Sequence, residues 1–110
     1  MKFINEKNRI LYMDDNGKVL AYVTFPKLDN NTVNINHTVV DPSLRGMGIA
    51  SKLLEEVVKV LKNENLKAVP SCSYAASWFE KHPEYNQYVK WILNLKGIIC
   101  YNSFCFFIVL

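Results

Sequence analysis

The sequence predicts one mixed α/β domain, with a mostly antiparallel sheet, a central βαβ unit and helices packed on the sheet. Three observations predict it. The chain has 110 residues, half of them apolar, which suffices for one hydrophobic core but not for two full domains. A hairpin signal lies near the N-terminus. A strand, a glycine turn, a helix and a second strand then follow one another in the middle of the chain.

The hairpin is predicted from two segments that are rich in β-branched and aromatic residues, at 9–14 and 18–25. Asp15-Asn16-Gly17 separates them, and an Asn-Gly pair between two such segments is the strongest short hairpin signal. These three residues join the two strands directly, without a helix between them.

A third strand is predicted over residues 32–40, where the side chains alternate with period two. In that alternation His37 shares a face with Val33, Ile35 and Val39. The strand ends at the following Asp-Pro pair, because proline lacks the N–H that a sheet needs.

A long amphipathic helix is predicted between the two strands of the βαβ unit. Its apolar positions are Ile49, Leu53, Leu54, Val57, Val58 and Leu61. Glu55 and Lys59 on the other face have the spacing of a supportive ion pair, and the helix ends near residues 63–65. Residues 66–70 then form a short strand, which the crossover makes parallel to the strand before the helix.

Ser73 is predicted to cap a second helix over residues 74–81, which Pro83 stops, and residues 85–93 are again helically spaced. Residues 97–110 form an apolar tail without a charged side chain. It is a buried strand, a hairpin around residues 102–103, or an irregular segment that is prone to aggregate. We expect residues 1–96 to form the domain and the tail to pack on it.

Charge and cysteine content exclude several classes of protein. A net charge of +3 is too small to indicate a nucleic-acid partner, and the chain begins with no signal-peptide pattern. We expect an intracellular, cytoplasmic protein with no membrane segment, as a monomer or weak dimer. Cys72, Cys100 and Cys105 include no CxxC pair and no His at metal-site spacing. Reduced thiols and no metal are therefore expected.

The turn before the long helix carries the clearest functional signal. Gly46 and Gly48 allow backbone conformations that are closed to other residues, and a helix N-terminus presents unbonded N–H groups to an anion. Arg45 would add a bidentate contact. A phosphate or pyrophosphate site is one interpretation of this turn, and a tight turn without a ligand is the other. The turn matches neither the Walker loop nor the dinucleotide fingerprint.

Two segments carry a family resemblance, HTVVDPSLRGMGIASKLLEEVV at 37–58 and AVPSCSYAASWFEKHPEY at 68–85. Together they resemble the small, single-domain, Yjdj-like branch of the GNAT acetyltransferases. Arg45-x-x-Gly48-x-Ala50 matches the acetyl-CoA signature of that superfamily. The resemblance spans roughly residues 12–85 and implies a GNAT-like fold that binds acetyl-CoA as cosubstrate.

The resemblance also implies which residues bind the cofactor. The backbone of Arg45, Gly46, Met47, Gly48, Ile49 and Ala50 would hold the CoA pyrophosphate. Val39 and Val40 would bind pantetheine through backbone hydrogen bonds, as an added strand does. Met47 stands where relatives often have glutamine, and we expect this departure to matter little because the backbone does the binding.

Acetyl transfer needs a deprotonated amine and a proton for the departing CoA thiolate. Alkyl amines have a pKa of about 10, so a base is required, and a histidine such as His37 suits that role. Its alternative is a structural histidine in a half-buried sheet. Cys72, before a helix, would be the acid or, less favoured, an acetyl carrier; its alternative is a small buried residue. Tyr74 is the rival proton donor and is also expected among the cofactor-binding residues.

The leading hypothesis is therefore an acetyl-CoA-dependent N-acetyltransferase in which the amine attacks directly. A second hypothesis is a CoA-binding module with little catalysis, and a third, nucleic-acid binding, rests on charge alone. Larger GNAT enzymes commonly insert helices between their first two strands to shape the acceptor site, whereas here residues 15–17 join those strands directly. The resemblance therefore implies an open acceptor side, which favours a protruding amine, such as a lysine side chain or a chain terminus. The sequence does not identify the acceptor.

Overall fold

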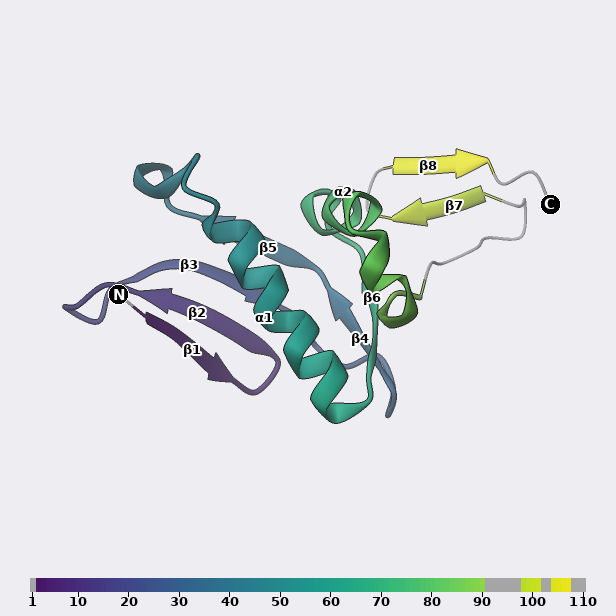
Figure 1. Cartoon of the computed structure of the whole chain (residues 1–110), viewed down its shortest axis with the longest axis horizontal. Coiled ribbons are helices and arrows are strands. Elements are labelled where there is room, and N and C mark those ends of the chain that lie inside the picture. The colour runs from purple at the N-terminus through teal and green to yellow at the C-terminus, as the bar shows by residue number, and fades with distance from the viewer. Residues whose placement is uncertain (1, 91–97, 102–103, 108–110) are drawn as a thin grey trace.

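The computed structural model describes residues 2–90, 98–101 and 104–107 (Figure 1). The strands are β1 (Lys2–Glu6), β2 (Arg9–Met13), β3 (Val19–Thr24), β4 (Thr32–Ile35), β5 (His37–Val40), β6 (Lys67–Pro70), β7 (Ile98–Tyr101) and β8 (Phe104–Phe107). The helices are α1 (Ile49–Glu64) and α2 (Ser73–Lys81), with the 3₁₀ helices η1 (Pro42–Leu44) and η2 (Pro83–Tyr88).

The sheet is mixed and mostly antiparallel, as predicted. Four antiparallel strands lie in the order β1-β2-β3-β5, while β4 and β6 pair in parallel across α1. The predicted hairpin is β2 and β3, and its turn includes Gly17 at a φ of +84°, where glycine is favoured. β1 lies in a segment to which the sequence analysis assigns no strand; it extends this sheet by pairing with β2.

The predicted third strand is two strands that belong to different sheets. The backbone N–H of Asn36 donates to the carbonyl of Thr24 at 3.2 Å, although Thr24 is already the register partner of His37. Two residues thus oppose one, which is the arrangement of a β-bulge. The bulge shifts the alternation by one residue: Val33 and Ile35 are fully buried, whereas His37 is exposed. The prediction that they share a face is therefore wrong.

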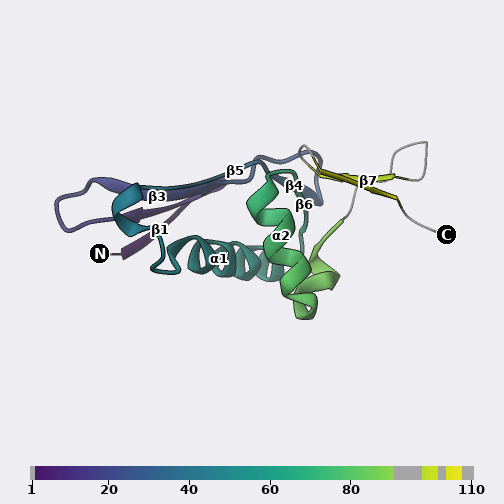
Figure 2. The same cartoon turned by 90° about the horizontal axis from the view of Figure 1, so that it is seen from above.

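The amphipathic helix is confirmed as α1. All of its predicted apolar side chains are buried, namely Ile49, Leu53, Leu54, Val57, Val58 and Leu61. Figure 2 shows α1 and α2 on the same side of the sheets, so no helix of the described residues lies over the other face of β1, β2, β3 and β5. Lys59 pairs with Glu56 at 3.1 Å, one residue from the predicted Glu55. Asn65 ends the helix in the left-handed conformation, which asparagine tolerates.

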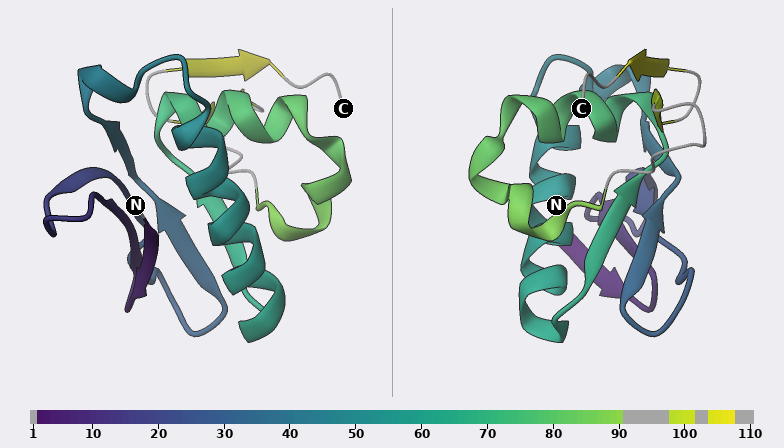
Figure 3. Two further views of the ribbon diagram at one scale, coloured as in Figure 1. Left: turned by 60° about the vertical axis from the view of Figure 1, so that its left-hand side comes forward. Right: turned by 90° about the vertical axis from the view of Figure 1, so that its right-hand side faces the viewer.

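The second helix begins one residue earlier than predicted. Cys72, not Ser73, is its N-cap, because Cys72 Sγ accepts a hydrogen bond from the Ala75 N–H at 3.3 Å. Trp78 Nε1 donates to Ser51 Oγ at 2.8 Å, which joins the middle of α2 to the first turn of α1 (Figure 3). The two helices therefore hold the glycine turn and the start of α2 close together.

The chain leaves the helical path after η2. Residues 85–88 of the predicted helix lie in η2, but Lys90 N–H donates to the Ala68 carbonyl at 2.8 Å and Val89 forms a parallel bridge with Ala68, so the helix does not continue over residues 89–90. Residues 91–93 of that prediction lie outside the described residues. β7 and β8 pair antiparallel, in agreement with the hairpin alternative for the tail. The packing of residues 97–110 on the domain stays a prediction.

Asp41 connects β5 to η1. Its Oδ1 accepts hydrogen bonds from Ser43 N–H at 2.9 Å and Ser43 Oγ at 2.7 Å, and its own N–H donates to the Leu20 carbonyl at 2.7 Å. The hydrogen bonds from Ser43 hold the pKa of Asp41 below its usual value, and the charges of Lys18 and Arg45 lower it further. The carboxylate therefore stabilises the turn that leads into the glycine segment.

Truncation of Leu54 tests the core that α1 builds. Leu54 is fully buried, so Leu54→Ala removes packed methyl groups and leaves a cavity, with an expected loss of about 2–5 kcal/mol in the free energy of unfolding. Glu55→Ala, on the exposed face of the same turn, should change it by less than about 0.5 kcal/mol. Urea unfolding measures both. Equal losses in the two variants would contradict the assigned packing of α1.

Asp41 predicts a pH dependence. Because its pKa is lower folded than unfolded, its ionised form stabilises the fold above the unfolded pKa of about 4, and this contribution is lost as pH falls through the folded pKa. Asp41→Asn keeps an oxygen acceptor but no charge. The Tm difference between wild type and variant, measured from pH 7 to pH 3, should be small, since the hydrogen bonds of the Asp41 carboxylate lie at the surface, and should shrink below about pH 4. A constant difference would contradict this.

Candidate functional site

The glycine turn presents backbone rather than side chains. Gly46 and Gly48 have φ of +83° and +74°, and Gly48 is the N-cap of α1 without a side-chain cap. The first intrahelical bond that closes on the cap is from Lys52 N–H to the Gly48 carbonyl at 3.1 Å. The N–H groups of the preceding helical residues have no carbonyl to bond within the helix. This turn can therefore receive an anion through its amides.

A pocket of about 230 Å³ lies at this turn. It is lined by Val40, Leu44, Arg45, Gly46, Gly48, Ile49, Ala50 and Tyr74. Most of the predicted cofactor-binding residues thus meet in one place, although they come from β5, the glycine turn, α1 and α2. Val39 and Met47 were predicted with them but do not line the pocket; their side chains are 43% and 60% exposed. Leu44 was missed, since nothing in its local pattern distinguishes it from an ordinary core residue.

The free edge of β5 faces this pocket. The Asp41–Leu20 hydrogen bond and the alternation of an antiparallel pair make Val39 a hydrogen-bonded partner of β3. The backbone groups of Thr38 and Val40 therefore point away from β3, at the outermost strand of the four-stranded sheet. In the part of the chain that the structure describes, no strand pairs with this edge. An extended ligand could bond there.

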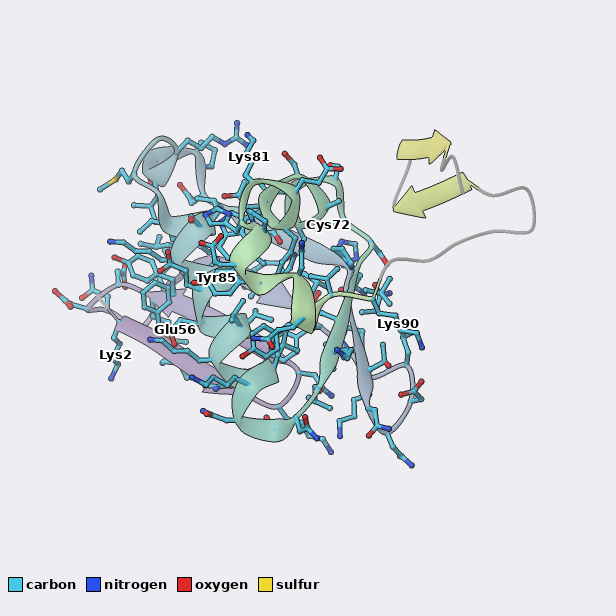
Figure 4. The ribbon with its side chains drawn as sticks, turned by 45° about the vertical axis from the view of Figure 1, so that its right-hand side comes forward. Lys2, Glu56, Cys72, Lys81, Tyr85 and Lys90 are labelled. Carbon is cyan, nitrogen blue, oxygen red and sulfur yellow. The ribbon has the colours of Figure 1, made fainter. Side chains whose placement is uncertain are left out.

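Cys72 lies at the junction of β6 and α2, next to the point where the chain passes from β4, which pairs with β6, to β5, which pairs with β3 (Figure 4). The N–H groups of Ser71 and Cys72 both donate to the Ile35 carbonyl, at 3.0 and 3.1 Å, which fixes the junction to the end of β4. The half-buried Cys72 Sγ lies 3.5 Å from Thr38 Oγ1 and receives the Ala75 N–H. The side chain that contacts Cys72 from β5 is therefore Thr38.

His37 and Tyr74 lie on different sides of β5. Thr38 pairs with the buried Val23 and so faces α1, whereas the adjacent His37 is exposed on the opposite face. The structure does not bring His37 and Cys72 onto one face. Tyr74 lines the pocket; burial raises the pKa of its phenol, and the neighbouring Cys72 raises it further. The phenol is therefore protonated at neutral pH and can donate a proton or a hydrogen bond.

The described residues contain neither a cluster suited to a metal ion nor a helix suited to span a membrane. Within residues 2–90, 98–101 and 104–107, no group of three or more His, Cys, Asp or Glu side chains is placed to hold a metal ion. In the same ranges, no helix is both long and apolar enough to cross a membrane.

Comparison with known proteins identifies the family. A model of the GCN5-related N-acetyltransferase family matches residues 9–89. Protein NATD1 of Xenopus tropicalis is 30% identical over 63 residues, which cover 57% of this chain and 58% of that protein, under two thirds of its length. A GCN5-like protein from Staphylococcus aureus, solved by NMR, is 34% identical, with a TM-score of 0.69 over 86% of this chain and 92% of that chain.

More distant structures share the fold alone. YhbS of Escherichia coli, a GNAT-family protein solved in complex with CoA, is 22% identical, with a TM-score of 0.53 over 67% of this chain and 47% of that chain. The family match covers the glycine turn, β5 and α2, which are the elements that build the pocket. The chain belongs to the GCN5-related N-acetyltransferase family.

Proposed function

We propose that the protein transfers the acetyl group of acetyl-CoA to an amine by direct attack in a ternary complex. One observation carries the proposal: the pocket at the start of α1 is lined by Val40 of the β5 edge and by Tyr74, which lies two residues after Cys72. An anion site, a strand edge and a proton donor are the three things that an acyl-CoA thioester needs. The CoA complex of YhbS, a protein of the same fold, supports the choice of ligand.

The pyrophosphate would bind the amides of the glycine turn and of the first residues of α1, with Arg45 as the nearest cation that lines the pocket. Pantetheine would then run along the free edge of β5. In this register the backbone groups of Thr38 and Val40 face the free edge. We therefore propose Thr38 and Val40, rather than Val39 and Val40, as the backbone partners of pantetheine. Met47 would contribute through its backbone, because its side chain points into solvent.

The chemistry would be divided between the two faces of β5. The acetyl thioester lies at the β5 edge on the α1 side, where Cys72 or Tyr74 gives a proton to the departing CoA thiolate. His37, exposed on the opposite face, takes a proton from the amine that arrives there. Attack forms a C–N bond and breaks the C–S bond, so one proton leaves the nitrogen and one is added to the CoA sulfur.

The acceptor would approach over the sheet face opposite α1 and α2 (Figure 2). An approach over that face suits an amine that protrudes from a larger molecule, such as a lysine side chain or a chain terminus. A CoA-binding module with little catalysis is the competing function, and the exposure of His37 is the observation that favours it, since an exposed side chain is less well positioned to take a proton from the amine.

Incubation with acetyl-CoA and a panel of amines, read by mass spectrometry, tests the function. The panel contains a peptide with a free N-terminus, a peptide with an internal lysine and a small polyamine. We expect acetylation of a peptide amine and no acetylated protein when the amine is omitted. An acetylated Cys72 formed and consumed at the rate of turnover would establish a carrier mechanism instead. CoA binding without transfer to any amine would support the binding module.

Two substitutions in the turn test the backbone account. Gly48→Val forces a β-branched residue to a φ of +74°, and a Cβ there meets no atom of the chain within 4 Å, so it enters the space left for the ligand. We expect CoA affinity to fall at least about tenfold. Met47→Gln, at an exposed side chain, should change it less than about twofold. Calorimetric titration measures both, and equal affinities would refute the account.

A further inference from the structure

Thr38 is a half-buried hydroxyl beside the thiol of the proposed site, and no step described above uses its side chain. It lies on β5 opposite the fully buried Val23, so its side chain faces the α1 side of the sheet. Its Oγ1 is 3.5 Å from Cys72 Sγ, and either atom can be the donor. No local pattern singles out Thr38, because threonine is common in strands.

The hydrogen bonds around Cys72 Sγ indicate a role for the hydroxyl of Thr38. The Ala75 N–H can only donate, so it occupies an acceptor position of the sulfur at 3.3 Å. The proton of the thiol therefore needs an acceptor elsewhere, and Thr38 Oγ1 is the one within reach in the described residues. Once the thiol has lost its proton, the same hydroxyl can rotate and donate to the thiolate.

We propose that Thr38 is the positioning residue of the acid step: its hydroxyl orients the Cys72 thiol and then stabilises the thiolate that the step produces. The inference rests on the proposed function. In that step the S–H bond of Cys72 breaks and an S–H bond forms on the departing CoA sulfur. Thr38 changes from acceptor to donor without losing its own proton, and solvent water later returns a proton to Cys72.

Threonine suits this part better than serine. Its β-branch leaves few rotamers in a strand, so the hydroxyl is held near the sulfur before the substrate arrives. Its backbone, one residue after the bulge, also faces the edge where pantetheine would bind. One residue therefore sets the distance between the thioester and the acid.

The test compares Thr38→Val, which keeps the shape and removes the hydroxyl, with Thr38→Ser, which restores it. We expect Thr38→Val to lower kcat about tenfold with an unchanged KM for acetyl-CoA, and Thr38→Ser to recover most of the loss. In a Cys72→Ala background, Thr38→Val should have no further effect on kcat. An unchanged kcat in Thr38→Val, or an equal loss in the Cys72→Ala background, would overturn the proposal.

A second readout does not depend on acetyl transfer. The alkylation rate of Cys72 by iodoacetamide at pH 7.4, resolved by peptide mass spectrometry, should fall several-fold in Thr38→Val and return in Thr38→Ser, with unchanged Tm. An alkylation rate equal to that of wild type would overturn the assignment of Thr38. A protein that transfers no acetyl group yet shows the alkylation difference would contradict the proposed function and leave the Thr38–Cys72 coupling supported.

Discussion

The site depends on one extra residue in a strand. Asn36 donates to the Thr24 carbonyl beside His37, and the bulge that results divides one extended segment between two sheets. Before the bulge, β4 pairs with β6; after it, β5 pairs with β3 and leaves its other edge unpaired in the described part of the chain. The bulge thus lies where the pairing with β6 ends, and the edge of β5 is free from there on in the described part of the chain.

Backbone hydrogen bonds join the end of β4 to the start of α2. The Ile35 carbonyl accepts both the Ser71 and the Cys72 N–H, so α2 begins beside the last residue of β4. Cys72 caps that helix through its sulfur, a role that also brings Thr38 against it. The glycine turn, the free edge of β5 and Cys72 thus come together through the backbone bonds to the Ile35 carbonyl and through the Trp78–Ser51 hydrogen bond, which joins α2 to α1.

Local patterns in the sequence predicted most of the helices and strands. The features that they did not predict depend on hydrogen bonds between residues far apart in the sequence. The hairpin at Gly17, α1 and the glycine turn before it each follow from neighbouring residues, and the structure contains all three. The bulge does not, because the period-two pattern continues through Asn36 and only pairing with Thr24 reveals it. The contact of Thr38 with Cys72 joins residues 34 positions apart, which no local pattern indicates.

The phase shift at the bulge has a chemical consequence for the proposed reaction. Because His37 and Thr38 are adjacent on β5, their side chains leave opposite faces of the strand, and a base at His37 cannot pass its proton directly to an acid at Cys72. Each group must recover its starting protonation state through solvent. The exposure of His37 permits this on one face, and the half-burial of Cys72 permits it on the other once CoA has left. The strand therefore separates the two proton transfers that a single acyl transfer requires.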